Sequence, residues 1–112
     1  MKIIKDMITF VELKKMAEEK FGNFVKAVVD INKNIIAVDG ELHADEETLL
    51  IEEGSKQQDL WGINIYPEIN REEWIEFDSM INIKPSYGNS SCDIENSEIK
   101  TRIKTIINKL VQ

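Results

Sequence analysis

One histidine and an acidic neighbour are the first residues that could do chemistry. His43 is the only histidine in the chain, and the acids Asp45 and Glu46 follow it two and three residues later. An imidazole beside carboxylates can ligate a metal ion or act as a general base. Transition-metal sites normally use more nitrogen or sulfur ligands than this chain can supply, so we predict no such site. The alternative is a structural His43 that hydrogen-bonds the start of the following helix.

A second group of polar residues is expected on one face of a β-hairpin. Asn64 and Asn82 share this face with Glu76 and Asp78, and Gly62 leaves open space opposite Asp78. Two carboxylates that lie two residues apart on a strand have Cα atoms about 6.5–7 Å apart. This spacing suits oxygen ligation of Mg²⁺ or Ca²⁺, or the separation of an acid from a base. The alternative is a solvated face with cross-strand pairing between asparagine and glutamate.

A polar loop, Tyr87–Ser91, is the third candidate. Its hydroxyls and backbone amides could cradle an anion, with Asn89 as a ligand-binding residue. The loop matches neither a P-loop nor a dinucleotide-binding fingerprint. An ordinary turn is therefore the alternative for this segment.

The hairpin that would carry the polar face is predicted from two alternating segments, Asp59–Tyr66 and Trp74–Lys84. We expect Tyr66 to pair with Trp74, because a slip of one residue would turn the whole apolar set outward. In this register the core face carries seven large apolar residues, namely Trp61, Ile63, Ile65, Ile75, Phe77, Ile81 and Ile83. The opposite face places Asn64 across from Glu76.

The remaining elements are marked by local signals. Thr9 and Glu12 form a capping box at the start of a first helix, and Asn96 is a suitable cap for the last one. Residues 25–40 predict a β-hairpin, with Asn34 suited to a left-handed turn position. Residues 42–54 favour a short helix, although the apolar run within them fits a buried strand equally well.

Together these elements predict one α+β domain over residues 1–112. Its core would be an antiparallel sheet of four to five strands, built from two hairpins, with two to three helices packed on one side. A chain of 112 residues with 42% apolar and 31% charged residues fits a single globular core. Cys92 is the only cysteine, which excludes an internal disulfide.

The charge distribution bears on the partners. Residues 41–97 carry fourteen acids and three bases, a net charge of −11, whereas residues 98–112 carry a net +3. The acidic middle repels phosphate backbones and argues against nucleic acid as the main partner. The cations of the last helix have an ordinary explanation in the helix dipole. No apolar run could span a membrane and no secretory signal is visible, so the cytoplasm is the expected location.

Three segments are distinctive: Gly40–Glu46, Asp59–Pro67 and Ile75–Pro85. With them the whole chain resembles a family of short prokaryotic proteins described as a domain of unknown function. The resemblance implies a compact family domain and carries no activity or cofactor over. Lys84 and Ser91 stand where the family tends to carry arginine and a basic residue, so a fixed arginine site for an anion is not implied there.

Two functions follow as expectations. The first is a non-enzymatic binding or interaction domain, expected to form a homodimer through apolar residues among polar neighbours on one sheet face, namely Leu60, Tyr66, Trp74 and Met80. The alternative is a small hydrolase or lyase that uses His43 with Asp45, Glu76 and Asp78, in one version with Mg²⁺. The ligand, substrate and cofactor are not identified by the sequence.

Overall fold

The computed structural model describes residues 1–112 and contains three α-helices and five strands. The helices are α1 (Phe10–Lys20), α2 (His43–Glu52) and α3 (Ser97–Leu110). The strands are β1 (Lys2–Ile4), β2 (Val25–Asp30), β3 (Ile35–Val38), β4 (Leu60–Ile65) and β5 (Ile75–Glu76). Single 3-10 turns cover Gln57–Asp59, Met80–Asn82 and Pro85–Tyr87. None of the helices has both the length and the apolar composition of a bilayer-spanning segment.

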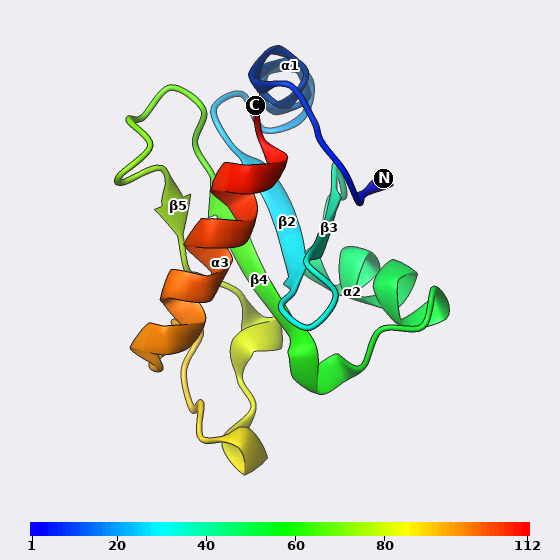
Figure 1. Cartoon of the computed structure of the whole chain (residues 1–112), viewed down its shortest axis with the longest axis vertical. Helices are drawn as coiled ribbons and strands as arrows, with labels where there is room; N and C mark the ends of the chain where they lie inside the picture. The colour runs from blue at the N-terminus through cyan, green and yellow to red at the C-terminus, as the bar shows by residue number, and fades with distance from the viewer.

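The strands form one antiparallel sheet in the order β1-β3-β2-β4-β5 (Figure 1). The predicted α+β class and antiparallel sheet of four to five strands are therefore confirmed, with five strands present. The central strands β2 and β4 are buried along almost their whole length. Both faces of the sheet must consequently be covered by other elements.

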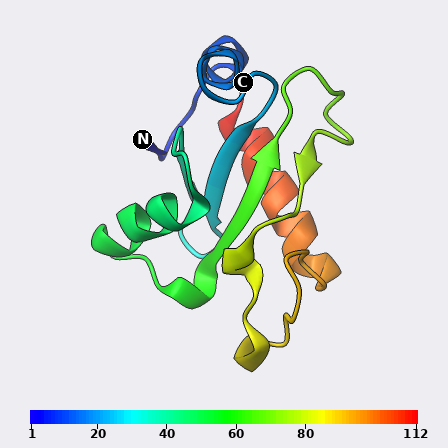
Figure 2. The same cartoon turned by 180° about the vertical axis from the view of Figure 1, so that it is seen from behind.

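Helices cover both faces rather than one. In Figure 1, α3 crosses the near face of β2 and β4, and α1 closes the end of the same core. Figure 2 shows α2 on the opposite side. Adjacent residues of β2 separate the two cores: Val29 packs in the larger cluster with α3, and Val28 packs with Leu50 of α2. Two helices, α1 and α3, thus lie on one side of the sheet as expected, and α2 covers the other side, because β2 is apolar on both faces.

The local signals mark the elements correctly. The Thr9 hydroxyl accepts the backbone N–H of Glu12 at 3.1 Å, and the Asn96 side chain accepts two backbone N–H groups at the start of α3. Asn34 adopts the left-handed conformation expected of it, with φ of 59°. Residues 43–52 are helical, which decides the segment that the sequence left open.

The second hairpin starts in the predicted register and then departs from it. Asn64 pairs with Glu76, and the Tyr66 N–H donates to the Trp74 carbonyl at 2.8 Å. The predicted strand Trp74–Lys84, however, is paired in the sheet only at Ile75 and Glu76. Beyond that point the chain leaves the ladder, so Asp78 is not paired with Gly62.

The side chain of Asn82 takes the place of the missing strand. Its Oδ1 accepts the Gly62 N–H at 2.8 Å, and its Nδ2 donates to the Gly62 carbonyl at 3.0 Å. A carboxamide carries the same donor and acceptor as a peptide group, so it satisfies β4 as a neighbouring strand would. A Cβ at Gly62 would lie 2.6 Å from the Cβ of Ser79, so glycine is what lets this segment approach.

We predict that Asn82→Ala destabilises the protein by about 2–4 kcal/mol, because the substitution leaves buried backbone groups of Gly62 without partners. Asn32→Ala is the matched control, since that residue is exposed and its side chain makes no hydrogen bond. Urea denaturation measures the free energy of unfolding of both variants. A loss in Asn82→Ala no larger than that in the control would contradict the role of this amide.

Candidate functional site

His43 is the first residue of α2, and its ring points at the sheet. Its Nε2 lies 2.8 Å from the carbonyl oxygen of Ile63, and because a carbonyl only accepts, Nε2 carries the proton. Burial lowers the pKa of the imidazole, with smaller and opposing contributions from neighbouring groups. The neutral ring therefore ties α2 to β4, which gives His43 a clear structural role.

Three of the four catalytic candidates lie in one region of the molecule, but neither carboxylate makes a hydrogen bond or ion pair with the imidazole. Against the larger lowering effect of burial on the pKa of His43, the negative charge of Asp78 acts to raise it. The Asn64 side chain lies beside the ring. Glu76 is held in place, since one of its carboxylate oxygens accepts the Asn64 amide at 2.8 Å and the Tyr66 hydroxyl at 3.1 Å. Asn64 therefore links the exposed Glu76 carboxylate to the surroundings of the buried imidazole.

Asp45 lies apart from this group. It is exposed on α2 and lines a shallow hollow with Met1, Thr48, Leu49 and Glu52. No three side chains of the histidine, cysteine, aspartate or glutamate types gather in a way that could hold a metal ion. The structure thus separates Asp45 from the histidine that the sequence placed next to it.

All three asparagines considered as ligand-binding residues are buried, and two of them, Asn82 and Asn89, are occupied by backbone groups of the protein itself. Asn82 binds both backbone groups of Gly62, and its Nδ2 also donates to the Cys92 carbonyl at 2.9 Å. The Asn89 amide donates to the carbonyls of Asn82 and Asp93, each at 2.7 Å, and its oxygen accepts the Glu95 N–H. These side chains hold the segment after β5 against the sheet.

Glu46, which the sequence offered only as a further carboxylate beside His43, is a buried acid. Its side chain is fully buried, and one oxygen accepts the Gly40 N–H at 2.9 Å while the other has no partner. A Cβ at Gly40 would lie 2.7 Å from the Glu46 Cγ, so the glycine makes the space that this carboxyl fills. Burial raises the pKa of Glu46 to about 9, which keeps the group neutral at physiological pH.

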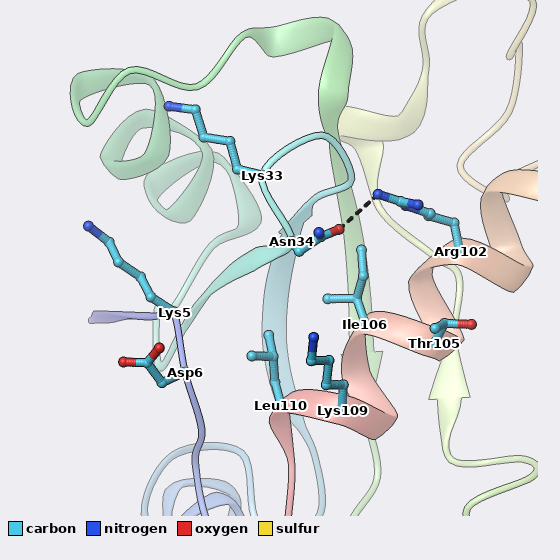
Figure 3. A pocket seen from close by; sticks show the side chains of 9 residues that line it. All are labelled: Lys5, Asp6, Lys33, Asn34, Arg102, Thr105, Ile106, Lys109 and Leu110. Atoms are coloured by element: carbon cyan, nitrogen blue, oxygen red, sulfur yellow. Dashed lines mark hydrogen bonds between the residues drawn. The ribbon is translucent and has the colours of Figure 1, made fainter.

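A basic groove lies on the other side of the molecule, between α3 and the β2–β3 turn (Figure 3). Its volume is about 390 Å³. Nine residues line it, namely Lys5, Asp6, Lys33, Asn34, Arg102, Thr105, Ile106, Lys109 and Leu110. Four of these are cations and one is an acid, in a protein whose net charge is −7.

Three separate segments bring these cations together. Arg102 and Lys109 lie seven residues apart, which places them on the same face of α3. Lys33 belongs to the β2–β3 turn, and Lys5 directly follows β1, which pairs with β3. The groove was missed in the sequence because the cations of α3 were explained by the helix dipole, whereas their neighbours come from distant parts of the chain.

Arg102 joins the helix to the turn. Its Nε donates to the Ile31 carbonyl at 3.2 Å, and one terminal nitrogen donates to the Asn34 Oδ1 at 2.9 Å, as Figure 3 shows for the second bond. The other terminal nitrogen has no acceptor within the chain. The guanidinium is therefore held in one orientation with a donor left over at the groove.

The apolar residues expected to form a dimer surface do not share one face. Leu60 packs in the smaller core beneath α2, and Trp74 is buried in the larger core on the opposite side of the sheet. Met80 is 80% exposed, and the ring of Tyr66 packs against that of Phe24 in a tilted arrangement. The set is split because Trp74 precedes β5 and turns into the core beside Phe10.

Comparison with known proteins places almost the whole chain in one family. The model of a family described as "Protein of unknown function (DUF5674)" matches residues 2–110. No curated protein and no solved structure matches the chain.

The raised pKa of Glu46 predicts a specific pH dependence of stability. The folded state keeps the Glu46 proton up to about pH 9, whereas the unfolded chain loses it near pH 4.5. The contribution of this group to the free energy of unfolding is therefore full below pH 4.5 and falls as the pH rises toward 9.

We expect Glu46→Gln, which mimics the protonated acid, to raise the melting temperature by several degrees at pH 8 and to leave it nearly unchanged at pH 4.5. Exposed Glu41→Gln serves as the control. Melting curves at several pH values test this, and an equal effect of Glu46→Gln at both pH values would contradict the assignment.

Proposed function

We propose that this protein, which belongs to the family of proteins of unknown function (DUF5674), has a binding function. The description of the family names no activity. In this proposal the protein is a non-enzymatic domain that holds a small anionic ligand in the groove between α3 and the β2–β3 turn. The observation that carries it is that Lys5, Lys33, Arg102 and Lys109 all line one hollow of an acidic protein, with Arg102 and Lys109 on the same face of α3.

Electrostatics and size both support a small anion. Like charges repel one another, so four cations around one hollow are a cost that a bound anion would offset. A concave surface also concentrates the field of its charges and attracts ions of opposite sign. The volume of about 390 Å³ lies at the lower end of the range for small-molecule sites.

Arg102 gives the groove a prepared anchor. Its hydrogen bonds to Ile31 and Asn34 already fix the side chain, so an anion that accepts its remaining N–H groups need not order it. Planar guanidinium groups bind phosphate and carboxylate oxygens through paired hydrogen bonds. The lysines extend from the groove as flexible charges that can close over a ligand.

The hydrolase or lyase alternative rests on the other face of the sheet. Glu76 and Asp78 lie near His43 there, which supports it, but the Nε2 proton of the imidazole is already donated to Ile63. Asp45 is also too far out on α2 to join them. We therefore rank this alternative second and propose the cytoplasm as the place of action, on the grounds given by the sequence.

Homodimerisation is a separate part of the proposal. Met80 is 80% exposed, and Ile83 and Tyr87 add exposed apolar surface from the same segment. We expect the protein to sediment as a dimer at micromolar concentration and Met80→Glu to shift it toward the monomer. Met7→Glu, at another exposed methionine, is the control. A wild-type protein that stays monomeric would refute this part.

Pyrophosphate is the probe for the groove itself. We expect it to bind the wild-type protein, and Lys109→Ala to weaken binding about tenfold, since each charge-assisted contact contributes about 1.5 kcal/mol or more. Lys104→Ala is the matched control, because Lys104 lies on the same helix but over the ring of Phe77. Titration calorimetry at low salt measures all three proteins.

Either of two results would refute the binding function. One is a wild-type protein that binds neither pyrophosphate nor other small anions. The other is an equal loss in Lys109→Ala and Lys104→Ala, which would show a general effect of charge rather than a site.

A further inference from the structure

We propose that the ligand of the basic groove is a small phosphate ester that carries hydroxyl groups near its phosphate, and that Asp6 recognises those hydroxyls. This inference rests on the proposed binding function and adds the chemical class of the ligand. A sugar phosphate is the simplest molecule of this class. The argument comes from the placement of the acid, the donors and the apolar floor of the groove.

Asp6 is the only acid that lines the groove. It is exposed, and its carboxylate makes no hydrogen bond or ion pair within the chain. An ionised carboxylate only accepts hydrogen bonds, so it repels a bare anion and attracts a group that donates. A ligand that is anionic at one end and hydroxylated at the other satisfies both kinds of residue.

The Arg102 and Asn34 donors lie across the groove from Asp6, the acceptor, which has Lys5 beside it. Figure 3 shows Arg102 and Asn34 facing each other across one rim, with Lys5 and Asp6 on the chain at the other side. Asn34 uses its oxygen for Arg102, which leaves its amide nitrogen as a further donor. The phosphate is therefore expected on the side of α3 and Arg102, and the hydroxyls on the side of Asp6.

The floor of the groove favours a compact ligand. Ile106 and Leu110 lie at its base and are almost fully buried, so they offer no polar partner. All polar contacts must come from the rim, where the charged side chains stand. A longer polyanion would have to leave the groove and cross a surface whose central segment, residues 41–97, carries a net charge of −11.

Two esters of equal charge test the inference. Ribose 5-phosphate and methyl phosphate carry the same phosphate group, but only the first has hydroxyls. We expect the wild-type protein to bind ribose 5-phosphate about tenfold more tightly than methyl phosphate, as one or two hydrogen bonds to a carboxylate would give. Asp6→Ala is expected to abolish this preference, because ribose 5-phosphate loses the acceptor of its hydroxyls while methyl phosphate binds as well as before or better. Glu41→Ala, an exposed acid outside the groove, should keep it.

The outcomes separate this inference from the proposed function. If pyrophosphate binds but the two esters bind equally, or if the preference survives in Asp6→Ala, the inference about hydroxyls is overturned and the groove stands. If pyrophosphate, ribose 5-phosphate and methyl phosphate all fail to bind, both this inference and the proposed binding function are refuted. A single-stranded oligonucleotide that binds more tightly than ribose 5-phosphate would overturn the compact-ligand argument.

Discussion

The central strands β2 and β4 are buried on both faces, and the arrangement of the other elements follows from this. An apolar surface on each side of the sheet requires a cover on each side. Helix α3 covers one face, and α2 covers the other. Since α3 runs along β2 and β4 beside the β2–β3 turn, Arg102 reaches that turn and the basic groove forms between them.

The face covered by α2 contains polar groups that must be satisfied without water. The ring of His43 donates to β4, Glu46 accepts from Gly40, and the amide of Asn82 completes the ladder at Gly62. Each of these contacts fixes the position of its segment relative to the sheet, because a shift would leave a buried donor or acceptor without a partner, which is costly. These contacts occupy His43 and Asn82, two of the residues that the sequence offered for a site, and the favoured site lies elsewhere.

Local signals predicted much of the fold, and long-range contacts account for what they missed. The cap at Thr9, the turn at Asn34 and the register at Asn64 depend on neighbours in sequence or on a simple alternation. The strand predicted up to Lys84 failed because alternation continues after Glu76 although a side chain, Asn82, replaces the backbone in the ladder. The groove joins three distant segments, and no local pattern reports such a meeting.

The central claim is that the groove beside α3 is a ligand site, and backbone NMR of the labelled protein titrated with pyrophosphate tests it most directly. The account predicts chemical-shift changes concentrated in the segments that line the groove, residues 5–6, 33–34 and 102–110. Residues around His43, Asn64 and Glu76 should change little, since they lie on the opposite face of the sheet. Changes confined to that opposite face, or no saturable changes at all, would contradict the account.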